Sequence, residues 1–159
     1  MENAIEKKER LSVSVSSAVF IEDEQGRLLL VQQAAERKRH KWGPPAGGLE
    51  PHENPISAAL REVKEELNVD IELIDLLGIY SVDRGEKASG LGFVFRGKII
   101  CGTIIPREGE INSFRFCSIQ EIEDLILNDQ IYKPEYNLDG IRDWIENVSY
   151  PLDVLKFKY

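Results

Sequence analysis

The sequence has few of the residues that build disulfide frameworks or thiolate metal sites. Its 159 residues include two cysteines, one methionine and two histidines. The spacing of Cys101 and Cys117 matches neither a zinc site nor a redox motif, and both lie in apolar and aromatic segments. We therefore expect two buried thiols with no part in function, and a disulfide-rich secreted domain is excluded.

Long apolar stretches are also absent. No window approaches the ~18 consecutive apolar residues of a membrane-spanning helix, and the first residues are too charged for a signal peptide. The sequence shows no repeat, low-complexity segment or linker. We expect a soluble, cytoplasmic protein without a membrane partner. Residues 1–159 are predicted to form one domain, with a core at about 12–128 and a C-terminal helix and tail at about 129–159.

Positive charge is scarce as well. The chain has 20 Lys and Arg against 28 Asp and Glu, a net charge of −8. A protein that binds duplex DNA or RNA needs a basic face, so that class is excluded. Phosphorylated small molecules are not excluded, because divalent cations bound to carboxylates invert the local sign of the field.

The N-terminal part of the chain predicts strands and a loop. Alternating residues at 11–20, a polar turn at 23–26 and an apolar run at 27–31 are typical of a β-hairpin. The basic segment 36–41 and the Gly- and Pro-rich segment 42–48 together predict one long loop without regular structure.

A helix is predicted from Pro55 to Leu67. Asn54 is a suitable N-cap because its side chain accepts backbone N–H groups, and Pro55 has no N–H to lose in the first turn. Apolar residues then recur at three- and four-residue steps, and Asn68 can adopt the left-handed conformation that ends a helix.

The remaining sequence alternates between strand-like and helix-like patterns. Strands are predicted at 69–82, 91–101 and 111–119, followed by helices at 120–127 and 135–146. The predicted fold class is α/β (α+β), with helices packed against a mixed central β-sheet.

Three glutamates share one face of the predicted helix. Glu62, Glu65 and Glu66 are three and four positions apart, so their carboxylates project to the same side. The opposite face carries the apolar stripe Leu60, Val63 and Leu67. An oxygen-rich cluster of this kind suits Mg²⁺ or Mn²⁺, and the alternative is a solvated acidic face.

Together with the preceding loop, this helix resembles the signature of the Nudix hydrolase family. That signature is G-x5-E-x7-R-E-U-x-E-E-x-G-U, where U is a bulky aliphatic residue, and eight of its nine specified positions are met here. The matching residues are Gly47, Glu53, Arg61, Glu62, Val63, Glu65, Glu66 and Val69. Asn68 replaces the last Gly, a change we expect to be tolerated because Asn also adopts the left-handed conformation. The resemblance extends over about residues 12 to 128.

The resemblance implies both a fold and a reaction. The fold is an α/β/α sandwich with a mixed central sheet. The reaction is divalent-metal-dependent cleavage of a nucleoside diphosphate linked to another moiety X, in which water attacks the pyrophosphate linkage to give a nucleoside monophosphate and phosphorylated X. The implied cofactor is Mg²⁺, with Mn²⁺ as an alternative.

The resemblance also implies roles for individual residues. Glu65 and Glu66 bind metal, and Glu62 either binds metal or accepts a proton from the attacking water. The carbonyl of Ala46 is a further ligand. Arg61 holds Glu65 by a salt bridge, and Glu53 supports the loop before the helix.

Other candidate residues lie outside the signature. Glu110 precedes a predicted strand, and a loop glutamate near the metals is an alternative base in this family; the other interpretation is a solvated loop residue. Basic residues before the signature are candidate contacts to the substrate's phosphates, or simply solvated charges. They are Arg37, Arg39 and Lys41.

The sequence does not name X or the base. A second interpretation from a different class is a sensor that binds a nucleotide or nucleotide-sugar without cleaving it. The intact set of glutamates argues against a sensor, because such domains usually have lost some of them. A homodimer is one alternative for the oligomeric state.

Overall fold

The computed structural model describes residues 12–36, 40–85 and 88–157 and shows two β-sheets. The larger sheet has the strand order β4-β1-β6-β5, in which β1 and β6 run parallel and the other neighbours run antiparallel. The smaller sheet has the order β3-β2-β7 and is antiparallel. The strands are β1 (Ser12–Ile21), β2 (Leu28–Gln33), β3 (Trp42–Gly43), β4 (Ala46–Gly48), β5 (Asp70–Asp83), β6 (Ala88–Cys101) and β7 (Ile111–Cys117).

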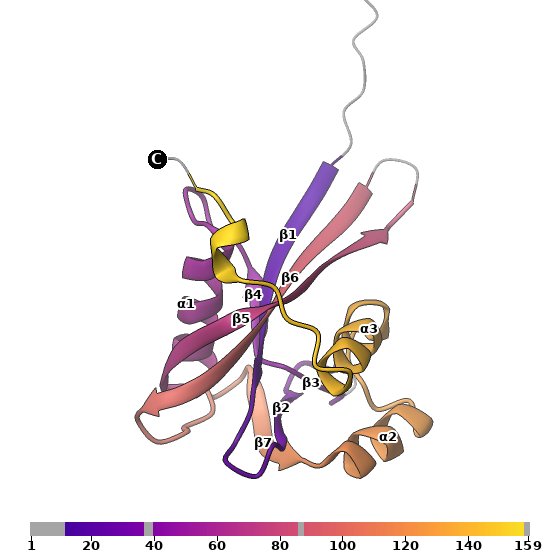
Figure 1. The fold of residues 1–159 in the computed structure, drawn as a ribbon. Helices are drawn as coiled ribbons and strands as arrows, with labels where there is room; N and C mark the ends of the chain where they lie inside the picture. Colours follow the sequence, from indigo (N-terminus) through magenta and orange to yellow (C-terminus); the bar gives the residue numbers. More distant parts are fainter. Residues whose placement is uncertain (1–11, 37–39, 86–87, 158–159) are drawn as a thin grey trace, which may run out of the picture.

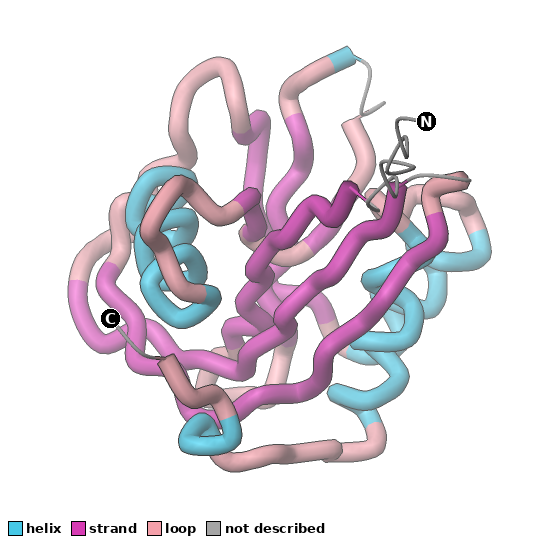
Figure 2. Tube along the Cα trace, turned by 90° about the horizontal axis from the view of Figure 1, so that it is seen from above, coloured by secondary structure: helices cyan, strands magenta, loops and turns pink. Residues whose placement is uncertain are grey.

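Helices cover both sides of the strands. In Figure 1, α1 (Pro55–Leu67) lies on one side, and α2 (Ile119–Leu127) and α3 (Pro134–Ile145) lie on the other. Figure 2 shows the same division from above. A short 3₁₀ helix, Leu152–Val154, follows near the C-terminus. The predicted α/β/α sandwich with a mixed sheet is confirmed.

Period-two alternation along the strands divides the apolar residues between two cores. On β1, Val19 and Ile21 belong to the cluster that contains Val63 and Leu67 of α1. The residue between them, Phe20, belongs to the cluster packed against α2 and α3. Successive side chains of a strand point to opposite faces, so one strand contributes to both cores.

The helix α1 is formed by local chemistry, as predicted. The side chain of Asn54 accepts a hydrogen bond from the Ser57 N–H at 2.9 Å, and Pro55 occupies the first turn. Asn68 has φ 59° and ψ 24°, the left-handed conformation expected at its position. Leu60, in contrast, was expected in the apolar stripe and is 39% exposed, because the face of this helix that packs against the core carries Ala59, Val63 and Leu67.

The predicted β-hairpin is wrong. A turn at 23–26 does join β1 to β2, but among the described residues the only bridge between the two segments pairs Glu22, just after β1, with Leu28. Over its full length β1 pairs with β6, and β2 pairs with β7. Both strands thus pair with segments that are distant in the sequence, and they belong to different sheets.

The loop prediction for 42–48 and one cysteine prediction are also corrected. Two short strands, β3 and β4, interrupt the predicted loop because each pairs with a neighbouring long strand. Cys117 is buried as expected, whereas Cys101 is exposed at the end of β6. Within the ranges that the structure describes, no helix is long and apolar enough to cross a membrane.

Candidate active site

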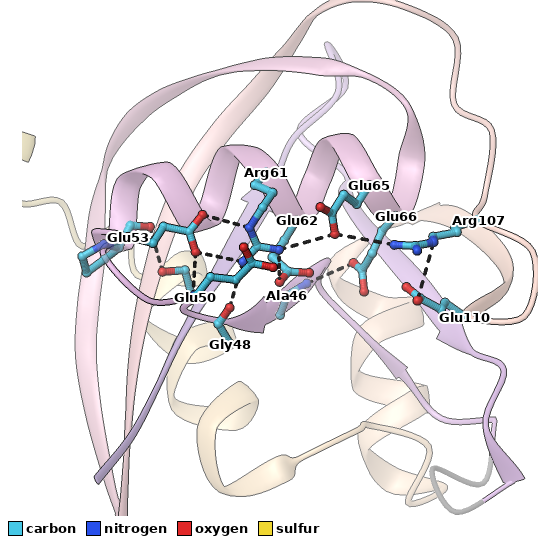
Figure 3. A network of polar contacts seen from close by, with 12 residues as sticks. Ala46, Gly48, Glu50, Glu53, Arg61, Glu62, Glu65, Glu66, Arg107 and Glu110 are labelled. Carbon is cyan, nitrogen blue, oxygen red and sulfur yellow. Dashed lines mark hydrogen bonds and ion pairs between the residues drawn. The ribbon is translucent and has the colours of Figure 1, made fainter.

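The guanidinium of Arg61 fastens the loop after β4 to the helix α1. It contacts Glu53 through two nitrogens, with Nε 2.8 Å from Oε1 and Nη2 2.9 Å from Oε2. Nη2 also donates to the carbonyl of Gly48 at 2.9 Å, and Glu53 in turn accepts from the N–H of Glu50 (Figure 3). The hydrogen bond between the two side chains lowers the pKa of the Glu53 carboxyl and raises the pKa of the Arg61 guanidinium. A bidentate pair of this kind fixes the orientation of the guanidinium relative to the carboxylate as well as the distance between them.

Glu62 is oriented by the same arginine and lies against β4. Nη1 of Arg61 donates to its Oε1 at 2.7 Å, and the Glu62 side chain is 15% exposed. Burial raises the pKa of this carboxyl, although Arg61 acts in the opposite direction. A Cβ at Gly47 would lie 1.9 Å from the carboxyl carbon of Glu62, so only glycine permits this close approach. The glycine requirement of the signature thus has a steric cause here.

Glu66 and Glu65 differ in exposure and partners. Glu66 is 5% exposed, and its Oε2 accepts from the backbone N–H of Ala46 at 3.1 Å. Glu65 is exposed, 3.4 Å from Nη1 of Arg61 and 3.5 Å from Nη1 of Arg107. The predicted pair of Arg61 with Glu65 therefore exists, but the main partner of Arg61 is Glu53.

The loop between β6 and β7 brings Glu110 towards the same cluster (Figure 3). The backbone N–H of Arg107 donates to the carbonyl of Glu66 at 2.8 Å, which fixes this loop to the end of α1. Its guanidinium lies between two carboxylates, with Nη1 near Glu65 and Nε 3.6 Å from Oε1 of Glu110. Sequence analysis did not identify Arg107, because no local pattern distinguishes it from other loop arginines.

Among the predicted basic contacts, the structure describes only Lys41, which has a partner other than the glutamates. Lys41 forms an ion pair with Asp129 at 2.9 Å and lines a separate hollow with Trp42 and Gln130. Arg37 and Arg39 lie outside the described residues.

A pocket adjoins the carboxylate cluster and was missed by sequence analysis. Its volume is about 460 Å³, within the usual range for small-molecule sites. Its walls come from β1, β4, β6 and the start of α3, and Ala46, Gly47 and Gly48 line it. Two glycines on one face of β6, Gly90 and Gly92, are the sequence feature that could have indicated a close neighbour there.

The carboxylates offer suitable donors for a hard divalent cation. In the described part of the chain, no three His, Cys, Asp or Glu side chains form a group that could hold a metal ion. The signature, residues 47–69, is called the box below. It nevertheless places the carboxylates of Glu62, Glu65 and Glu66 on neighbouring turns, and two of these are largely buried. A cation would offset the cost of burying like charges, and carboxylate oxygens are preferred by Mg²⁺ and Mn²⁺. The residue types therefore fit such a cofactor, although their carboxylates are not gathered into one group among the described residues.

Comparison with known proteins shows which family shares these features. The chain is 32% identical over 115 residues to the human diphosphoinositol polyphosphate phosphohydrolase NUDT4B, covering 72% of this chain and 61% of that protein. It is 39% identical over 87 residues to the mouse 8-oxo-dGDP phosphatase NUDT18, covering 55% of this chain and 25% of that protein. It thus spans less than two thirds of these curated relatives.

A solved structure and a family profile extend the likeness over most of the chain. The NUDIX hydrolase from Nitrosomonas europaea superposes with a TM-score of 0.80 at 29% identity, covering 92% of this chain and 98% of that one. The profile described as NUDIX domain matches residues 13–137. With the signature, the fold and this match in agreement, the chain belongs to the Nudix family.

Proposed function

We propose that the protein is a divalent-metal-dependent pyrophosphohydrolase. Its substrate would be a nucleoside diphosphate linked to a moiety X, and its products a nucleoside monophosphate and phosphorylated X. The observation that carries this proposal is the network in which Arg61 holds Glu53, Glu62 and the loop after β4 in one arrangement. The names of the relatives, an 8-oxo-dGDP phosphatase and a diphosphoinositol polyphosphate phosphohydrolase, also involve diphosphate groups.

The metal-ligand proposal assigns Glu62, Glu65, Glu66 and the Ala46 carbonyl to Mg²⁺ or Mn²⁺. Bound there, the cation would neutralise phosphoryl charge and lower the pKa of a coordinated water. Arg61 orients Glu62, and the Ala46 N–H orients Glu66, so two of the carboxylates are held before the substrate arrives. Preorganised charges of this kind need little rearrangement during the reaction.

The base that accepts the proton from water is proposed to be Glu62 or Glu110. Glu62 is the candidate within the signature, and its carboxyl group lies against Gly47 of β4. Glu110 is held near the cluster through Arg107. Glu62→Gln and Glu110→Gln distinguish them, because loss of the base lowers kcat and removes the acidic limb of the pH profile.

Hydrolysis should be tested with Mg²⁺ or Mn²⁺ on nucleoside triphosphates, oxidised nucleotides, ADP-ribose, nucleotide-sugars and diphosphoinositol phosphates. Glu66→Gln is compared with wild type, and Glu72→Gln, which alters an exposed pair with Lys98, serves as the control. We expect loss of a metal carboxylate to lower the rate at least ~30-fold, or about 2 kcal/mol, with folding retained.

Two outcomes would contradict the proposal. Activity of Glu66→Gln within about threefold of wild type would remove Glu66 from the metal site. If no compound is hydrolysed but one raises the melting temperature of the wild type, the protein is the sensor considered above.

Several sequence predictions stay predictions. We propose that residues 1–159 form one domain, that Arg37, Arg39 and Lys41 contact the substrate, and that the protein acts in the cytoplasm. A homodimer would be tested by light scattering at several protein concentrations.

A further inference from the structure

We propose that the pocket beside β4 binds a second anionic group of the substrate, a phosphate remote from the scissile pyrophosphate. Arg84 and Lys133 on its rim would select for that group. This inference rests on the proposed function, because it assigns a chemical class to the part of the substrate beyond the pyrophosphate.

The charge of the pocket differs from that of the protein as a whole. The chain has a net charge of −8, yet the described residues that line the pocket include Arg84 and Lys133 and no Asp or Glu. The remaining lining residues are glycines, small apolar residues, hydroxyl and amide side chains, and aromatic rings. A concave surface lined by one sign of charge concentrates ligands of the opposite sign. The pocket therefore favours an anion.

Arg84 is held at the rim by neutral groups. Its Nη1 donates to Oγ of Ser14 at 3.2 Å, and its Nη2 donates to the hydroxyl of Tyr136 at 3.1 Å. Its guanidinium carbon also lies 5.7 Å from the centre of the Tyr136 ring. These contacts orient the guanidinium without offsetting its charge, and an oriented guanidinium matches the geometry of a phosphate.

Tyr136 is fixed in position by the strand beneath it. It is 7% exposed, and a Cβ at Gly90 would lie 1.7 Å from its hydroxyl oxygen. A Cβ at Gly92 would lie 3.1 Å from Cδ1 of the same ring. Glycine at both positions lets the ring approach β6, so the partner that orients Arg84 is itself buried and constrained.

Lys133 adds positive potential from a second element of the rim. It immediately precedes α3, whose first turn begins at Pro134. The N-terminus of this 12-residue helix carries partial positive charge, which adds to that of the ammonium group.

The strand β4 connects this pocket to the box. Ala46 and Gly47 line the pocket, while the Ala46 N–H binds Glu66 and Gly47 lies against Glu62. If the pyrophosphate of a substrate lies at the glutamates, the moiety attached to that pyrophosphate would therefore extend into the pocket. A phosphate on that moiety would meet Arg84 and Lys133.

Binding tests this inference without requiring catalysis. Isothermal titration calorimetry would compare the 3′,5′-bisphosphates of adenosine and guanosine with the corresponding 5′-monophosphates, which differ by one remote phosphate and have no pyrophosphate to cleave. We expect wild type to bind a bisphosphate about tenfold more tightly than its monophosphate. Arg84→Ala and Lys133→Ala should each reduce that ratio towards one, and Arg84→Lys should restore part of it.

Lys98→Ala is the matched control, because Lys98 pairs with Glu72 and does not line the pocket. Equal affinities of wild type for mono- and bisphosphates of both bases would overturn the inference. A preference that persists in the double variant Arg84→Ala/Lys133→Ala would overturn it as well. Either result can coexist with metal-dependent hydrolysis, so failure here is distinguishable from failure of the proposed function.

Discussion

Two regions of opposite charge adjoin β4. On the box side, three glutamates contact Arg61, and the shortest contacts of that arginine fix Glu53 and Glu62. On the pocket side, Arg84 and Lys133 line a cavity to which no described acidic residue contributes. The box is ordered by ion pairs, whereas Arg84 is ordered by neutral hydroxyl groups.

This difference teaches how an acidic protein can accommodate an anionic ligand. Carboxylates gathered in one place can be loaded with cations, and separate basic residues can receive the remaining anionic groups. Under our proposals, damage to the box should alter the reaction rate, and damage to the pocket should alter substrate preference. Four further experiments test the box side of this comparison.

The largest effect is expected from Gly47→Ala. The added Cβ would occupy the position of the Glu62 carboxyl group, so that group must move. We expect kcat/KM to fall roughly 100-fold, equivalent to about 2.7 kcal/mol of transition-state stabilisation. Gly48→Ala is the control, because its Cβ would approach only the Val15 carbonyl, at 3.9 Å. Equal activities of the two variants would contradict the steric role of Gly47.

Arg61→Ala should have the next largest effect, on stability. It removes the partner of Glu53 and Glu62 and the donor to the Gly48 carbonyl. We expect a loss of roughly 1–3 kcal/mol in the free energy of unfolding, measured by urea titration. Arg61→Lys should lose less because it keeps the charge without the bidentate geometry. Unchanged stability of Arg61→Ala would show that the network contributes nothing to folding.

A smaller effect concerns the pH dependence of stability. The Arg61 hydrogen bond lowers the pKa of Glu53 below its ordinary value of 4.5 in the folded state. The stabilisation is therefore fully present above pH 4.5 and is lost as the pH falls through the lowered value. The difference in melting temperature between wild type and Glu53→Gln should thus be largest near pH 7 and shrink towards pH 3. A difference that grows on acidification would reverse the assigned sign.

The smallest effect is expected from Arg107→Ala. Arg107 lies near Glu65 and Glu110, and both pairs are about half exposed, so each interaction is weak. Removing this competing cation should increase the affinity for Mn²⁺ by only ~2–3-fold in isothermal titration calorimetry. Lys98→Ala should leave that affinity unchanged. Weaker Mn²⁺ binding by Arg107→Ala would instead show that the loop arginine supports the site.

Interactions between near neighbours in sequence were the most predictable part of the fold. The bounds of α1, its Asn54 cap and its left-handed end at Asn68 all follow from side chains within a few residues. The predicted long strands and C-terminal helices also agree with the structure to within a few residues. The hairpin failed because the partners of β1 and β2 are distant segments, and strand pairing depends on which edges meet.

For the site, the sequence by itself determined which residues carry the carboxylates and their shared face of α1, because helical periodicity fixes both. Only the tertiary structure decided that Glu53 is the main partner of Arg61, since that contact depends on how the loop after β4 folds back. The same is true of the pocket, where Arg84 and Tyr136 come together across 52 residues of sequence. Local patterns encode conformation, but contacts between distant residues exist only after the chain has packed.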